Sequence, residues 1–139
     1  MNSKKGEITF LDFDRTFLEQ KFLLNLPHQW IELSDIRHTN GFCEWDSFNE
    51  IGKRLEAEKT GSLVFIGNGN YHYVTALLLK KMREPFSLVL FDHHADMMEQ
   101  DDSLISCGSW VRYALKTNPL IRKILMVGIN PKDCSAFSS

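Results

Sequence analysis

The stretch Phe86-Ser87-Leu88-Val89-Leu90-Phe91-Asp92-His93-His94-Ala95-Asp96 decides the fold. The apolar run that ends at Phe91 is rich in strand-forming residues, so we expect a buried strand over 86–91. Two carboxylates and two imidazoles follow within five positions. Such groups are costly to desolvate at the end of a buried strand unless something compensates their charge. The carboxyl ends of strands are also where ligands bind in open α/β sheets. The stretch therefore predicts a metal site at a strand end.

The spacing of the charged residues supports this interpretation. If extended geometry continues past the strand, Asp92, His94 and Asp96 point to one side of the chain. A set of this kind supplies oxygen and nitrogen donors to one ion, or bridges two. Mixed carboxylate and imidazole ligation suits Mn, Fe or Zn better than Ca or Mg. The alternative is a helix N-terminus capped by Asp92, which explains one carboxylate and leaves the rest of the cluster unexplained.

Strands and helices alternate along the chain. Apolar runs predict strands, and apolar residues spaced among charges predict helices. Segment 17–40 shows little periodicity. The alternation is typical of a parallel sheet with right-handed crossovers, so we expect one α/β domain over residues 1–139 with a mainly parallel sheet. The expected strands are 8–13, 63–66, 86–91 and 121–129, and the expected helices are 46–59, 71–83 and 109–116.

Composition limits the class of protein. The 139 residues are 43% hydrophobic and 24% charged, as in an ordinary globular domain. A net charge of -2 gives no reason to expect nucleic acid or a membrane surface as a partner. No apolar run approaches the roughly 20 residues that span a bilayer, and the chain start lacks a signal-peptide core. Three scattered cysteines favour a reducing compartment, so we expect a cytoplasmic protein.

A second segment carries a candidate ligand. The strand at 63–66 runs into the loop Gly67-Asn68-Gly69-Asn70, and His72 begins the next helix. The loop lacks the third glycine of a dinucleotide-binding fingerprint and the Gly-Lys-Ser/Thr of a P-loop. A single histidine after a loop is more often structural. Because neighbouring strand ends meet at one edge of a parallel sheet, however, we expect His72 to join the cluster at 92–96.

In this order, the two segments resemble the N-terminal portion of the arginase/agmatinase (ureohydrolase) superfamily. That family has a strand followed by Gly-Gly-Asp-His, then a helix, then a strand followed by Asp-x-His-x-Asp. Asp92-His93-His94-Ala95-Asp96 matches the second motif fully, whereas Gly69-Asn70-Tyr71-His72 agrees with the first at the initial glycine and the histidine. Cys107-Gly108 keeps the glycine of a later His-Gly pair and replaces its histidine. The resemblance covers the segment 62–130.

The resemblance implies a three-layer α/β/α, ureohydrolase-like fold and a centre with two Mn²⁺ ions. Asp92 would bridge the ions, His72 and Asp96 would complete one of them, and His94 would bind the other. Asp92 and His94 would then be the catalytic positions. A water whose pKa is lowered by the two cations would attack the carbon of a guanidinium or amidine group. The implied activity is hydrolysis of C–N bonds in small guanidino or amidino substrates.

Two departures from the family keep other interpretations open. The family's later Asp-x-Asp pair has no counterpart before Ser139, so the chain corresponds to a fragment or to a short form. A degenerate, non-catalytic binding domain is therefore an alternative. Replacement of the family's histidine by Cys107 removes a proton-shuttling group, and a small buried residue is favoured there over a thiol nucleophile. Aromatic residues in so short a domain would leave apolar surface, which predicts a homo-oligomer.

Phosphoester hydrolysis is a further alternative. Asp12-Phe13-Asp14-Arg15-Thr16 after a strand resembles the first motif of haloacid-dehalogenase-type phosphatases, in which Asp12 would attack phosphorus and Asp14 would act as acid and base. That family also needs a downstream acidic motif, and this chain has Ile129 where the motif requires an aspartate. The run Asp92-His93-His94 also resembles the signature of DHH phosphoesterases, an interpretation that leaves Asp96 without a role.

Overall fold

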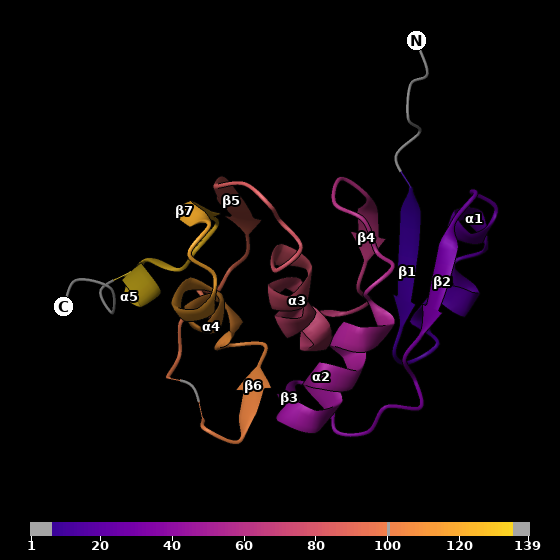
Figure 1. The fold of residues 1–139 in the computed structure, drawn as a ribbon, viewed down its shortest axis with the longest axis horizontal. Coiled ribbons are helices and arrows are strands. Elements are labelled where there is room, and N and C mark those ends of the chain that lie inside the picture. The colour runs from indigo at the N-terminus through magenta and orange to yellow at the C-terminus, as the bar shows by residue number, and fades with distance from the viewer. Residues whose placement is uncertain (1–6, 100, 135–139) are drawn as a thin grey trace, which may run out of the picture.

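The computed structural model of the chain describes residues 7–99 and 101–134. The chain start, for which the sequence predicts no leader, lies outside the described residues, and so does the side chain of Cys134. Within these residues the fold is mixed α/β, with three small sheets, two of them parallel, and helices packed against them (Figure 1). No helix in the described part is long and apolar enough to cross a membrane.

A three-stranded parallel sheet has β1 (Ile8–Asp12) between β2 (Gln29–Glu32) and β4 (Leu63–Phe65). Thr9 to Asp12 are fully buried because β1 has a neighbour on each edge and apolar residues on its faces. In the register of this sheet, Phe10 pairs with Trp30 on one side and Phe65 on the other. The Phe10 and Phe65 rings stack with their centroids 4.9 Å apart. Burial of these rings explains why β1 is the most deeply buried strand.

The second parallel sheet pairs β5 (Phe86–Phe91) with β7 (Ile121–Val127), and α4 (Trp110–Thr117) lies between them in the chain. The third sheet is an antiparallel pair of short strands, β3 (Phe42–Glu44) and β6 (Leu104–Ser106). In Figure 1 the arrows of β1, β4 and β5 point to the same end of the molecule. The carboxyl ends of the strands that precede the two predicted motifs therefore lie at one edge.

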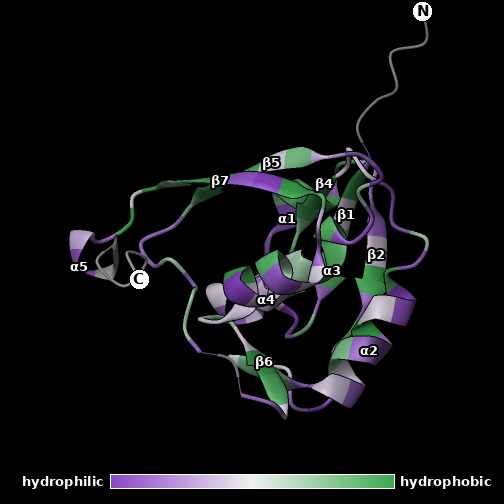
Figure 2. Cartoon of the chain, turned by 60° about the vertical axis from the view of Figure 1, so that its left-hand side comes forward, coloured by the Kyte–Doolittle hydropathy of each residue, from purple (hydrophilic) through white to green (hydrophobic). Residues whose placement is uncertain are grey.

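Two predictions about the sheet are wrong in detail. The sequence predicts one parallel sheet, but among the described residues β4 pairs only with β1 and β5 only with β7. It also predicts that β5 is buried, yet Val89 and Phe91 are exposed and only Leu90 is fully inside. The reason is visible in Figure 2, where α3 (Thr75–Leu79) and α4 lie on the same side of the β5–β7 sheet. No element in the described part of the chain covers the outward-facing half of β5.

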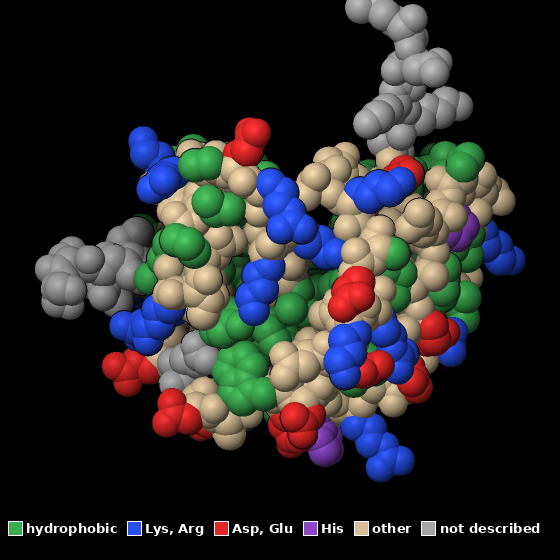
Figure 3. All heavy atoms as spheres, in the orientation of Figure 1, with side chains coloured by type: hydrophobic (Ala, Val, Ile, Leu, Met, Phe, Trp, Pro, Cys, Tyr) green, Lys and Arg blue, Asp and Glu red, His purple; other side chains and the backbone are tan. Residues whose placement is uncertain are grey.

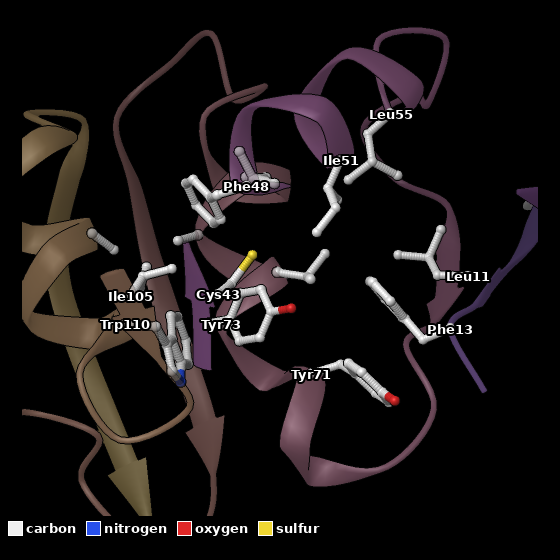
Figure 4. Packing of buried hydrophobic residues seen from close by; sticks show 14 of the residues in the cluster. Leu11, Phe13, Cys43, Phe48, Ile51, Leu55, Tyr71, Tyr73, Ile105 and Trp110 are labelled. Atoms are coloured by element: carbon white, nitrogen blue, oxygen red, sulfur yellow. The ribbon is translucent and has the colours of Figure 1, made fainter. Parts of the chain in front are cut away.

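The hydrophobic core lies between the sheets and the helices (Figure 4). The amphipathic α2 (Trp45–Arg54) buries Phe48 and Ile51, as the apolar spacing of this segment predicts. The predicted helix at 71–83 begins as a 3₁₀ helix, η2 (Gly69–Val74), and continues as α3. Tyr73 and Trp110 are among the largest fully buried side chains. Together these residues fix the position of η2, which carries His72.

The weakly periodic segment 17–40 contains three short elements that the sequence did not predict. These are η1 (Thr16–Glu19), α1 (Lys21–Leu24) and the edge strand β2. The remaining helix, α5 (Pro131–Cys134), is a single turn after β7. Figure 3 shows acidic and basic side chains on the same face, with Lys and Arg side chains down its middle where α3 lies. The mixture agrees with the small net charge of the chain.

Candidate metal centre

The loop after β4 places His72 at the edge where the carboxyl ends of the strands lie. Gly67 has a φ of +102°, which a residue with a Cβ rarely adopts, and it turns the chain away from the strand. The side chain of Asn68 then caps η2 by accepting a hydrogen bond of 2.9 Å from the backbone N–H of Asn70. The His72 ring packs against the indole of Trp110, with their centroids 5.0 Å apart. Sequence and packing together hold this imidazole in one place.

The two carboxylates come from the turn after β5. The backbone N–H of Asp92 donates to the carbonyl of Val127 over 3.0 Å, which keeps Asp92 beside β7. Its Oδ1 accepts a hydrogen bond of 3.1 Å from the backbone N–H of His94, an Asx turn that ends the extended geometry. Asp96 has a φ of +52°, in the left-handed region. The predicted continuation of the strand is therefore wrong, and Asp92 meets Asp96 because the chain turns.

His72, Asp92 and Asp96 form one group whose ligand atoms all lie within 4.8 Å of one another. His72 Nδ1 lies 3.1 Å from Asp92 Oδ2 and 3.3 Å from Asp96 Oδ2. Donor atoms that share one ion at bond lengths of about 2.1 Å are separated by about 3.0 to 3.4 Å in octahedral or tetrahedral geometry. The two separations from His72 Nδ1 fall in that range, so the group could hold a single transition-metal ion.

Neighbouring groups hold Asp96 in place. Its side chain is only 8% exposed, and Trp110 Nε1 donates a hydrogen bond of 2.7 Å to Oδ2. The carbonyl of Asp96 also accepts from the backbone N–H of Val111 over 3.1 Å at the start of α4. A left-handed backbone at a non-glycine residue is strained, and such strain concentrates at functional sites. Hydrogen bonds of this kind orient carboxylate ligands in metal centres.

The electrostatics of the group favour a cation. The hydrogen bond to Asp96 and the negative charges of Asp96 and Asp92 raise the pKa of His72 above its ordinary value, although partial burial opposes this. Two carboxylates thus share one imidazole, which carries a proton more readily than a free histidine does. A metal ion would supply the same positive charge and displace that proton.

His94, the fourth predicted ligand, does not join this group. Its side chain is 72% exposed, and its Nδ1 lies 3.9 Å from Asp92 Oδ1. Within the described residues, His94 belongs to no group of three side chains that could hold an ion. His93, on which the DHH interpretation depends, is also exposed. The structure therefore assembles three of the four predicted ligands around one position and leaves His94 at the rim.

A cavity of about 610 Å³ opens beside the group. Its wall includes Cys107 and Gly108, the pair aligned with the family's His-Gly. Burial raises the pKa of the Cys107 thiol, and the negative charges of Asp96 and Asp92 raise it further, so the thiol stays protonated at neutral pH. The cavity is lined by Gly69, Asn70, His72, Asp92, His94, Ala95, Asp96, Met97, Met98, Cys107, Gly108 and Lys132.

Several residues in and around the site were not predicted from the sequence. Trp110 contacts both His72 and Asp96, but its position on the helix after the motif shows no pattern that marks such a role. The sulfur of Met98 lies 2.8 Å from where a Cβ on Gly108 would stand, so this flexible side chain packs closely over the glycine. Lys132, on α5, also lines the cavity and lies beyond the segment of the resemblance.

The phosphatase-like motif has a different environment. Asp12 is fully buried, and its Oδ1 accepts from the backbone N–H of Arg15 over 2.8 Å, while its Oδ2 accepts from the Arg15 guanidinium over 2.9 Å. Asp14 accepts from the backbone N–H of Thr16 and from the side-chain amide of Asn68. Since both oxygens of Asp12 are engaged by Arg15, this geometry favours a structural role in the turn after β1.

Comparison with known proteins finds a relative that matches most of the chain. The chain is similar to an uncharacterized protein of Thermotoga maritima, with 31% identity over 126 residues. The match covers 91% of this chain and 50% of the Thermotoga protein, so the chain spans about half the length of this curated relative. No family model matches the chain. No solved structure matches it significantly.

Proposed function

We propose that this chain forms part of an arginase-like hydrolase that uses a metal centre to cleave C–N bonds in small guanidino or amidino compounds. The observation that carries the proposal is the group formed by His72, Asp92 and Asp96, with donor separations of 3.1 and 3.3 Å suited to one ion. The full match of residues 92–96 to the family's Asp-x-His-x-Asp motif supports it. The corresponding fold would be the three-layer, ureohydrolase-like arrangement.

The ligand set suits Mn²⁺, with Fe²⁺ and Zn²⁺ as competitors, because two carboxylates and one imidazole form a site of intermediate hardness. When bound, such an ion lowers the pKa of a coordinated water and polarises the substrate. The residues of this chain would hold the ion and shape its surroundings. Trp110 donates to Oδ2 of Asp96, while the turn engages Oδ1 of Asp92 and leaves its Oδ2 3.1 Å from His72 Nδ1.

His94 has a separate task in this proposal. Its imidazole is exposed at the cavity, and its Nδ1 lies 3.9 Å from Asp92 Oδ1. It would bind a second Mn²⁺ together with Asp92, as the family resemblance implies. The cavity of about 610 Å³ has room for a small substrate. The substrate, activity and partners of a full-length protein are part of the same proposal.

Metal binding is the first test. Purified chain is dialysed against Mn²⁺, and bound metal is measured by mass spectrometry together with the thermal stability of the protein. We expect one tightly bound ion per chain, and loss of that ion in Asp92→Asn and His72→Gln. Asp14→Asn and His93→Gln are matched controls, because both residues are exposed and lie outside the group. Equal Mn²⁺ content in all five proteins would contradict the proposed centre.

Activity is the second test. We expect urea release from arginine or agmatine that depends on Mn²⁺ and falls in Asp92→Asn and His94→Gln. Hydrolysis of p-nitrophenyl phosphate that survives Asp92→Asn but not Asp12→Asn would instead support the phosphatase interpretation. Tight metal binding without turnover of either class of substrate would support a non-catalytic binding domain. The readouts separate these outcomes because Asp12 and Asp92 belong to different clusters.

A further inference from the structure

The β5–β7 sheet presents an apolar face that no described element covers. Val89, Phe91, Leu125 and Val127 are all exposed there. They form two cross-strand pairs, because Val89 is in register with Leu125 and Phe91 with Val127. Phe91 is 77% exposed and Leu125 is 55% exposed, which is unusual for large apolar residues in the middle of a strand pair. Figure 2 shows the helices α3 and α4 on the other side only.

The opposite face of the same sheet is covered by the core. Leu88 and Leu90 alternate with the exposed residues and pack into the core together with Ile124 and Met126. Parallel sheets are found almost only with both faces covered, because the crossover helices bury each face. A pair of strands is also too small to be stable by itself. An apolar face of this kind in a parallel sheet therefore marks a site of contact.

The exposed face changes from polar to apolar along the strands. At the start of the pair, Ser87 is in register with Lys123, and both are exposed on this side. Toward the carboxyl ends the face becomes entirely apolar. Phe91 directly precedes Asp92, so whatever covers this end lies beside the candidate metal centre. A complementary surface needs apolar side chains near Phe91 and an acidic or polar group near Lys123.

We propose that this face is an internal surface of a larger unit, covered by amphipathic helices from a segment equivalent to the unmatched half of the Thermotoga relative. The relative carries as much chain outside the matched region as within it, since the match covers 50% of its length. Helices that complete the second layer of a parallel sheet supply the required apolar stripe. This inference concerns the uncovered sheet and does not depend on the metal or on the reaction.

The test is co-production of this chain, carrying an affinity tag, with the unmatched half of the Thermotoga protein as a separate polypeptide. We expect the two to co-purify in equal amounts. Phe91→Ser combined with Leu125→Ser should lower recovery of the partner about tenfold or more, since buried aromatic anchors dominate such contacts. The matched control is Phe22→Ser combined with Leu63→Ser, because Phe22 is 79% and Leu63 55% exposed on other elements. The control should recover the partner as the unchanged chain does.

A second measurement covers the case in which the separate half does not fold. Hydrogen exchange is compared between the full-length Thermotoga protein and its matched region alone. We expect the peptides aligned with β5 and β7 to exchange more slowly in the full-length protein. Equal exchange in both, or co-purification that the Phe91 and Leu125 changes leave intact, would overturn the proposal. A stable dimer of this chain that the same double change dissociates would assign the face to a second copy and would also overturn it.

Discussion

Trp110 Nε1 donates a hydrogen bond of 2.7 Å to Oδ2 of Asp96, and both side chains are buried. The same indole packs against the ring of His72. One residue of α4 therefore positions ligands that come from two different strand ends. Because ligand orientation depends on such neighbours, the metal affinity of the centre should depend on Trp110, which does not itself offer a ligand atom.

Trp110→Phe should weaken Mn²⁺ binding about 10- to 100-fold, the usual effect of losing a partner of a ligand. It should also lower the free energy of unfolding by about 1–3 kcal/mol, because a buried carboxylate oxygen loses its donor. Calorimetric titration and urea unfolding measure the two effects. Trp45→Phe is the matched control, since Trp45 Nε1 also donates over 2.7 Å, but to the exposed carbonyl of Asp102. Unchanged Mn²⁺ affinity in Trp110→Phe would show that Asp96 needs no such support.

Gly128→Ala should disturb the centre through the backbone. Gly128 has a φ of +92°, and an added Cβ would stand 3.1 Å from the carbonyl oxygen of Asp92. Gly61→Ala is the control, because Gly61 has a φ of +85° with no atom within 4 Å of the added Cβ. Both changes should cost about 1–2 kcal/mol of unfolding free energy from left-handed strain. Only Gly128→Ala should also weaken Mn²⁺ binding, and equal affinities in the two variants would contradict this.

A rise in pH should lower the stability of the metal-free protein and raise its affinity for Mn²⁺. The pKa of His72 is raised in the folded state, chiefly by Asp96. Its contribution to stability without metal is therefore fully present below the ordinary pKa of 6.5 and is lost as the pH rises through the raised value. Mn²⁺ affinity should instead rise with pH, because the ion competes with that proton. Urea unfolding and calorimetry across pH, each compared with His72→Gln, measure the two trends. Parallel trends in both measurements would contradict this coupling.

The fold was predictable where apolar runs have clear boundaries. The strand at 86–91 was predicted to the residue, because Pro85 precedes the run and Asp92 follows it. By contrast, β2 is a short edge strand without a fully buried residue, so its sequence carries no alternation to detect. The pairing of β3 with β6 was missed because each strand has only three residues. The division of the sheet was missed because it depends on which strand ends find hydrogen-bonding partners.

The candidate site was predictable as a set of residues but not as a geometry. Asp92 and Asp96 were marked by their position after a strand and by their Asp-x-His-x-Asp spacing. The two carboxylates lie close together because Asp96 has a left-handed backbone, a conformation that cannot be predicted from the residue type. The hydrogen bond to Trp110 spans 14 positions and belongs to tertiary packing. His94 was placed beside the other ligands by extended geometry, which the Asx turn at Asp92 replaces.

The two cysteines with described side chains should differ in reactivity, in a way that tests the packing around the cavity. Cys43 is fully buried, and burial raises its pKa to about 11. Cys107 is partly exposed on the cavity wall, with a pKa raised by burial and by Asp96. In a Cys134→Ser background, iodoacetamide should therefore label Cys107 more slowly than a free thiol and should reach Cys43 only as the protein unfolds. Mass spectrometry of labelled peptides measures both rates. Rapid labelling of Cys43 in folded protein would mean that the core between β3 and α2 opens readily, and the position of η2 with His72 would then be less rigid than its packing indicates.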